Sequence, residues 1–211
     1  MAKAAQTPLL DRIETVFGTR GFPDALFYQF ENALRFELGG DREYVDRFLE
    51  VLNRSRAVAE ALFSESAGLT VIRRTYSWNG APREARPTLR LLRDMGAPYR
   101  FSPPESLPDA DEFLPDSDES HQVWRALEIE ADPRLIEAVL WSALKIWPVS
   151  GSPAAKFFIV DFERGLALWP YDDRGMDVIA TSRGPLVDVY QRFQPWLLDY
   201  DRARMDAKFA T

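Results

Sequence analysis

The sequence predicts an α+β protein: an antiparallel sheet of about six strands with a three-stranded meander near the C-terminal end, flanked by helices. Apolar runs at 156–162, 166–171 and 176–181 are separated by turns short enough for hairpins. Apolar residues at helical spacing elsewhere predict helices that can cover the sheet. No glycine-rich phosphate loop follows a predicted strand, so neither a dinucleotide-binding fold nor a P-loop is supported.

The first half of the chain predicts alternating helices and strands. Apolar residues at helical spacing indicate a short helix over 9–17 and a longer one over 45–63. Residues 33–38 alternate between apolar and polar, which is typical of a half-buried strand, and two glycines follow them. The β-branched and aromatic residues of 69–78 predict a further strand.

The second half begins with an unusual segment. Residues 97–119 contain five prolines and a run of acidic residues, so we expect an acidic, proline-rich loop or insertion that is solvated rather than an acidic binding arm. A strand over 122–131 follows, and Asp132-Pro133 indicates the start of a helix. After the meander, a helix is expected over 182–193.

Length and composition restrict the possibilities. A chain of 211 residues with 46% hydrophobic residues can bury a core, and we expect one domain over 1–211. With no cysteine, a disulfide, a Cys-ligated zinc site and a thiol nucleophile are excluded. The only histidine, His121, is expected to be solvated near the start of a strand.

The charge of the chain bears on its partners. The formal net charge is −7, whereas nucleic-acid binding needs a basic surface, so we expect no nucleic-acid partner. No apolar run reaches about 18 residues, so no membrane span is predicted and the cytoplasm is the expected location. The sequence indicates no cofactor and leaves the oligomeric state open.

The turn Asp172-Asp173-Arg174-Gly175 is the first candidate site. Paired carboxylates can hold a divalent cation or share a proton, and the arginine can clamp an anion. Asp177 could join this group from the next strand. The alternative, which we favour, is turn chemistry: aspartates satisfy local backbone donors, Arg174 neutralises them, and Gly175 supplies the positive φ of a bulged hairpin.

Two further sets are candidates. Arg35 and Glu37 point to one face of the strand over 33–38, and Arg35 could pair with an aspartate of the turn if that strand neighbours the meander. A simple cross-strand ion pair is the favoured interpretation, ahead of an anion site. Trp169 alternates away from its leucine neighbours and is a candidate exposed aromatic, and Tyr171 follows it.

The tail 199–202, Asp-Tyr-Asp-Arg, is expected to be an exposed helix of mixed charge rather than a segment whose tyrosine bonds back to the sheet. Together with 22–39 and 171–180, the segment 190–202 resembles a bacterial family catalogued as domain of unknown function 3885. That resemblance implies a fold shared with small bacterial proteins, and it transfers no activity.

The expected function is that of a non-catalytic cytosolic interaction protein, immunity- or adaptor-like, for which a basic protein partner suits the acidic chain. We assign no catalytic residue and no metal ligand on this interpretation. One alternative is a metal-dependent hydrolase or transferase that uses Asp172, Asp173 and Asp177, with Arg35 or Arg174 as an anion clamp. Another is a small-ligand-binding domain, which a pocket lined by Trp169 and Tyr171 would indicate.

Overall fold

One antiparallel sheet forms the centre of the molecule. The computed structural model describes residues 7–40, 43–78, 81–82, 92–94, 96, 100–108, 121–144 and 155–210. Within these ranges the strand order is β1-β8-β7-β6-β2-β5-β4, and the two-residue β3 pairs with β2. The bounds are Ala33–Glu37 for β1, Gly68–Trp78 for β2, Ala81–Pro82 for β3, Glu105–Pro108 for β4, His121–Glu130 for β5, Lys156–Asp161 for β6, Leu166–Pro170 for β7 and Gly175–Ala180 for β8.

Every strand pair is antiparallel, so the predicted α+β class is confirmed. Among the described residues, seven strands follow the path of the sheet rather than about six. The meander is confirmed as β6, β7 and β8. Gly165 turns the chain between β6 and β7 with a φ of +64°, and the Thr181 hydroxyl lies 2.3 Å from where a Cβ would stand, so this position requires glycine.

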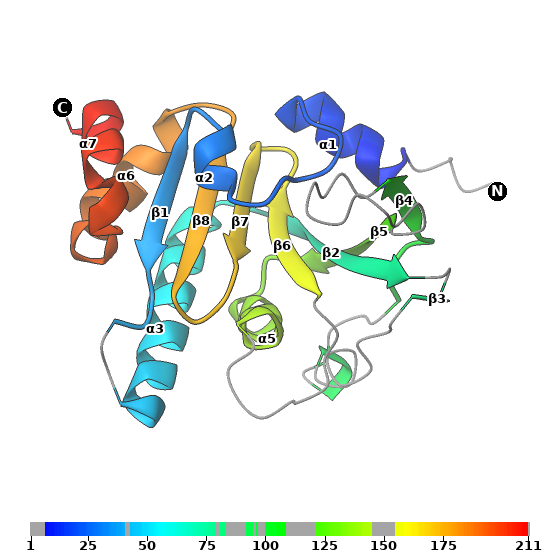
Figure 1. Ribbon diagram of the computed structural model, residues 1–211, viewed down its shortest axis with the longest axis horizontal. Helices are drawn as coiled ribbons and strands as arrows, with labels where there is room; N and C mark the ends of the chain where they lie inside the picture. Colours follow the sequence, from blue (N-terminus) through cyan, green and yellow to red (C-terminus); the bar gives the residue numbers. More distant parts are fainter. Residues whose placement is uncertain are drawn as a thin grey trace.

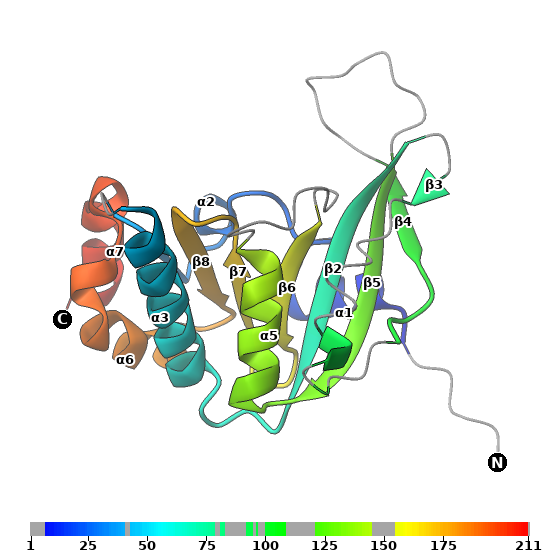
Figure 2. The same ribbon diagram turned by 90° about the horizontal axis from the view of Figure 1, so that it is seen from below.

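Helices cover both faces of the sheet (Figures 1 and 2). Two of them, α3 and α5, lie on one face, whereas α1 and the short α2 lie on the other; α6 and α7 are placed beyond the β1 edge (Figure 1). The bounds are Leu9–Phe17 for α1, Leu26–Gln29 for α2, Tyr44–Leu62 for α3, Pro133–Ala143 for α5, Gly184–Arg192 for α6 and Arg202–Phe209 for α7. The sheet is therefore the middle layer of three.

Strand β1 is more deeply buried than its alternating pattern suggested. Four of its five residues are buried, and only Glu37 is exposed. The C-terminal segment covers the free edge, because the Leu198 N–H donates to the Arg35 carbonyl at 2.9 Å and Leu197 forms an isolated bridge with Phe36. An edge strand covered in this way offers few unpaired backbone groups to another chain.

Part of the segment predicted as a loop is a strand. Within 97–119, Glu105–Pro108 forms β4 on the edge of β5, while 97–99 and 109–119 lie outside the described residues. Glu105 also caps α1, since its carboxylate accepts from the N–H groups of Leu9 and Leu10 at 2.6 and 2.9 Å. The helix start predicted at Asp132-Pro133 is confirmed, and the Asp132 side chain caps α5 by accepting from the Arg134 N–H at 2.7 Å.

The core is a continuous apolar cluster to which both helical layers contribute. Leu10 and Phe27 enter it from one face of the sheet and Val51 and Val139 from the other, and all four are at most 3% exposed. Burial of this extent is the dominant stabilising contribution to such a fold. No helix within the described ranges is long and apolar enough to cross a membrane.

Candidate functional site

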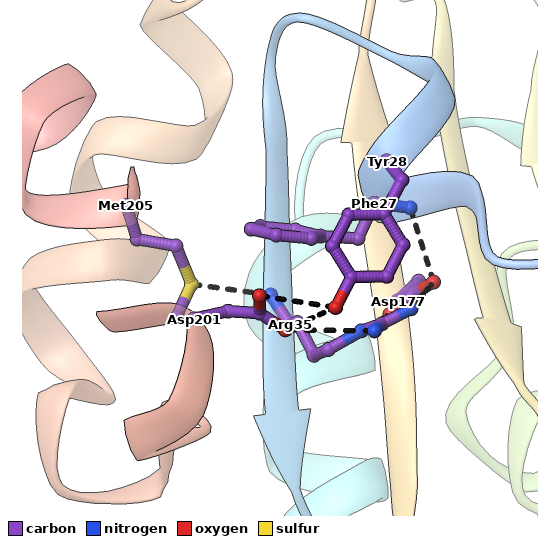
Figure 3. Close-up of polar contacts among 6 residues, drawn as sticks. All are labelled: Phe27, Tyr28, Arg35, Asp177, Asp201 and Met205. Atoms are coloured by element: carbon purple, nitrogen blue, oxygen red, sulfur yellow. Dashed lines mark hydrogen bonds and ion pairs between the residues drawn. The ribbon is translucent and has the colours of Figure 1, made fainter. Parts of the chain in front are cut away.

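Arg35 and Asp177 form a buried ion pair on the face of the sheet that α2 covers (Figure 3). The residues are direct partners in the antiparallel β1–β8 register, so their side chains emerge side by side. Arg35 Nε donates to Asp177 Oδ1 at 2.7 Å, and Nη2 donates to Oδ2 at 2.8 Å. Asp177 has no exposed surface. The geometry is the bidentate fork that makes arginine–carboxylate pairs strong and directional.

Two distant segments complete the surroundings of Arg35. The Phe27 N–H of α2 donates to Asp177 Oδ2 at 3.1 Å. Asp201 lies in the 3₁₀ turn Asp199–Asp201 (η2), 3.5 Å from Arg35 Nη1, and it accepts from the Tyr28 hydroxyl at 3.1 Å. In Figure 3, Asp201 and Asp177 approach the arginine from different sides. Arg35 therefore joins β1, β8, α2 and the C-terminal segment.

The charge of Arg35 is stabilised by these contacts. Burial alone would lower its pKa, but the hydrogen bonds and the charge of Asp177 raise the pKa well above its ordinary value. The guanidinium carbon also lies 4.6 Å from the ring centroid of Tyr28 and 5.7 Å from that of Tyr171. Arg35 is thus a permanently charged, fixed group.

A cleft of about 700 Å³ opens beside Arg35. Trp169 and Tyr171 of the β7 end contribute its aromatic surface, with ring centroids 5.5 Å apart. The other lining residues are Asp24, Ala25, Arg35, Glu37, Gly40, Arg47, Lys156, Asp172, Arg174 and Leu198. A volume of this size is within the range of pockets that hold ligands.

The hydroxyl of Tyr171 lies in a shielded, partly negative environment. Burial, followed by the nearby charge of Asp177, raises the pKa of Tyr171 to about 12, and Arg35 offsets part of this effect. The phenol therefore stays protonated at neutral pH and can donate a hydrogen bond. Trp169 is only 5% exposed, although the sequence suggested an exposed side chain, because its ring stacks on Phe158 at 5.7 Å.

The cations that line the cleft already have carboxylate partners. Arg174 binds Asp172 at 2.6 Å, on the lip of the cleft. Arg47 of α3 binds Asp173 at 2.7 Å, which ties the β7–β8 turn to that helix.

Asp24, which also lines the cleft, has two cationic partners. It accepts from Lys156 at 2.5 Å and also binds the buried Arg74. Burial opposes ionisation of Asp24, but the bonds from Lys156 and Arg74 outweigh it and lower its pKa below the ordinary value. The charged side chains that line the cleft are thus largely neutralised by ion pairs with other side chains of the protein.

Glu37 differs from the other acids of the cleft. It is the last residue of β1, and its side chain is exposed at the cleft. Its carboxylate has neither a hydrogen bond nor an ion pair in the part of the chain that the structure describes, although Arg54 donates to its backbone carbonyl at 3.0 Å. Glu37 is therefore a carboxylate available to a ligand.

The structure brings together most of the residues that the sequence singled out. Six of them, Arg35, Glu37, Trp169, Tyr171, Asp172 and Arg174, line the cleft. Asp173 turns toward Arg47 and Asp177 lies beneath Arg35, so the three aspartates do not converge. Over the described ranges, no three Asp, Glu or His side chains form a group that could hold a metal ion.

The explanation of Gly175 from turn geometry is wrong. Its φ is not positive, and the residue lies within β8 rather than in a bulged turn. A Cβ at this position would lie 2.0 Å from the Tyr171 hydroxyl and 2.7 Å from the Phe36 carbonyl oxygen. Glycine is needed at position 175 because the phenol of Tyr171 occupies the space that a side chain at this position would fill. Gly175 is paired with Glu37 in the β1–β8 register.

Sequence reasoning missed several residues of this site. Asp24 precedes α2, Arg47 lies in α3 and Lys156 begins β6, and no local pattern connects these three segments. In the tail, the sequence drew attention to Tyr200, but Tyr200 is 87% exposed and Asp201 is the residue that reaches the sheet. No local signal distinguished Asp201, because Asp199 and Tyr200 before it are both exposed and the segment shows no alternation of exposed and buried positions.

Comparison with known protein families identifies one family that matches the chain. The profile described as Domain of unknown function (DUF3885) matches residues 9–201, which include the ion pair and every residue that lines the cleft. Searches of curated proteins and of solved structures found no match.

Proposed function

The chain belongs to the DUF3885 family, and we propose that it is a non-catalytic binding protein that holds a partner in the cleft beside Arg35. The partner we propose is a protein, as for an adaptor or an immunity protein. The observation that carries this proposal is the composition of the cleft. It combines an aromatic surface with charged side chains that the protein itself holds in place. A surface whose side chains are already held in position is preorganised to bind a partner.

The positions of the aspartates favour binding over metal-dependent hydrolysis. A metal centre needs several carboxylate oxygens directed at one point. Asp172, Asp173 and Asp177 instead bind three different arginines, Arg174, Arg47 and Arg35 respectively. These carboxylates support the shape of the site.

Exposed tyrosines next to the cleft favour a protein over a small molecule. Tyr28 is 45% exposed above Arg35, and Tyr200 is 87% exposed in the adjoining C-terminal turn. Tyrosine is enriched at protein–protein interfaces because it offers apolar area together with a hydrogen-bonding group. A partner seated in the cleft can extend over both rings.

Blocking the cleft tests this proposal. Because the chain has no cysteine, Arg174→Cys creates a single thiol on the lip of the cleft, and a bulky thiol reagent can be attached there. Arg134→Cys places the same label on an exposed position at the start of α5, away from the cleft. We expect affinity capture from extracts of the source organism to recover a specific protein with labelled Arg134→Cys and to lose it with labelled Arg174→Cys.

Equal capture by the two labelled proteins would contradict the proposal. Thermal melts with Mg²⁺, Mn²⁺ and Ca²⁺ test the metal-dependent alternative, since a metal at 100 times its Kd stabilises the native state by about 2.7 kcal/mol. We expect no such shift. A shift that disappears in Asp173→Asn would favour the hydrolase or transferase instead.

A further inference from the structure

The charge balance inside the cleft bears on which ligand it accepts. Each of the four cations that line it is matched by a carboxylate: Arg35 by Asp177, Arg47 by Asp173, Lys156 by Asp24 and Arg174 by Asp172. After this matching, Glu37 remains as a carboxylate with no partner within the described residues. An incoming anion would compete with carboxylates already in place, whereas an incoming cation meets an available one.

We propose that the cleft accepts an arginine or lysine side chain of a basic partner protein, with its charged end on Glu37 and its stem over Tyr171, next to Trp169. This proposal rests on the proposed function and names the chemistry of the partner. The structure places the available carboxylate and the aromatic surface in one cleft. A cation above an aromatic ring is stabilised by the negative face of the ring, in addition to its ion pair.

The protein already uses these rings in this way. The Lys156 ammonium lies 5.8 Å from the ring centroid of Trp169, and the Arg35 guanidinium lies 5.7 Å from that of Tyr171. Their electrostatic surroundings are therefore compatible with a nearby positive charge, provided that a carboxylate balances it. For the ligand, Glu37 is that carboxylate.

The position of Glu37 suits an approach from solvent. The residue ends β1, its neighbour in the register is Gly175, and glycine adds no side chain between Glu37 and the cleft. The net charge of −7 also attracts a basic protein before contact is made. The local geometry at Glu37 and the long-range electrostatic field of the protein thus both favour a positively charged partner.

A charge-matched pair of variants tests the inference. Glu37→Gln removes the available carboxylate, and Glu130→Gln removes an exposed glutamate at the end of β5, a strand separated from the cleft strands in the sheet order. The probes are capped peptides with one central residue flanked by glycines: arginine, its neutral isostere citrulline, or glutamate. Binding is followed by tryptophan fluorescence and by chemical shifts of the Trp169 indole N–H.

We expect the arginine peptide to bind more tightly than the citrulline and glutamate peptides. We expect Glu37→Gln to weaken it by about tenfold and Glu130→Gln to leave it unchanged. Equal weakening by both variants would overturn the inference, because the peptide would then be attracted by the net charge of the protein and not by Glu37. An arginine peptide that does not bind would also overturn it.

The peptide test is distinguishable from the test of the proposed function. If the glutamate peptide binds best, the cleft is a binding site that selects anions, and only the inference about the cation fails. If the labelled Arg174→Cys protein still captures its partner, the proposed function fails whatever the peptides do.

Discussion

The carboxylate of Asp177 accepts two hydrogen bonds from the guanidinium of Arg35, at 2.7 and 2.8 Å, across 142 residues of sequence. The pair holds the middle of β1 against β8 and directs Arg35 toward the cleft. Because both groups are desolvated, the stability of this region depends on their remaining together.

Breaking this pair should destabilise the protein strongly. We expect Asp177→Ala to lower the free energy of unfolding by about 3–5 kcal/mol, because it leaves Arg35 buried without its partner. The double variant Arg35→Met/Asp177→Leu should lose less, since no uncompensated charge remains. Urea unfolding measures both. A double variant that is less stable than Asp177→Ala would contradict this account.

Adding a methyl group at Gly175 should be costly. In Gly175→Ala the Cβ would overlap the Tyr171 hydroxyl and the Phe36 carbonyl, so we expect a loss of about 1–3 kcal/mol and a displaced Tyr171. The control is Gly184→Ala at the start of α6, where no atom lies within 4 Å of the new Cβ. That variant should be neutral or stabilised by up to about 1 kcal/mol. Equal effects on the two melting temperatures would refute the steric explanation.

Ala25, on the wall of the cleft, has a φ of +54°, which an L-residue adopts only with strain. We expect Ala25→Gly to raise the free energy of unfolding by up to about 1 kcal/mol, because relief of strain exceeds the added entropy of the unfolded chain. The same change at Ala207, exposed within α7, should instead destabilise by about 0.5–1 kcal/mol. Chemical denaturation compares them, and shifts of the same sign would exclude strain at Ala25.

Tyr171 should contribute a pH dependence at alkaline pH. Its pKa of about 12 exceeds the ordinary value of 10.0, so between these values the folded protein binds the proton more tightly than the unfolded chain. Its contribution to stability is complete below pH 10 and is lost as the pH rises toward 12. We expect Tyr171→Phe to show a shallower loss of stability across this window. Identical pH profiles for the two proteins would show that the phenol titrates normally.

Local pattern was sufficient for the meander, although it missed β4, which lies in a segment predicted as a loop. The apolar runs at 156–162, 166–171 and 176–181 and the two short turns between them predicted the meander, because adjacent antiparallel strands need only a hairpin. The same alternation placed Arg35 and Glu37 on one face of β1. The resemblance at 22–39, 171–180 and 190–202 predicted the family that the profile confirms.

Local pattern also predicted an ion pair for Arg35, with a cross-strand pair as the favoured interpretation and an aspartate of the turn as a possible partner. The observed partner is Asp177, which lies opposite Arg35 in the neighbouring strand and not in the turn. Asp172 and Asp173 are instead taken by Arg174 and Arg47. The choice depends on the register between β1 and β8, and a shift by one residue would have turned Arg35 to the other face.

The amino-acid sequence alone was enough to predict the class of the fold, the meander and the alternation that directs Arg35 and Glu37 to one side. The folded molecule was needed to show that β1 lies beside β8, that Asp201 approaches Arg35 from 166 residues away, and that Glu37 has no partner among the described residues. The difference arises because hydrophobic periodicity reports which face of an element is buried. It carries no information on which distant element covers that face, and the charge balance of a cleft is the sum of such distant contacts.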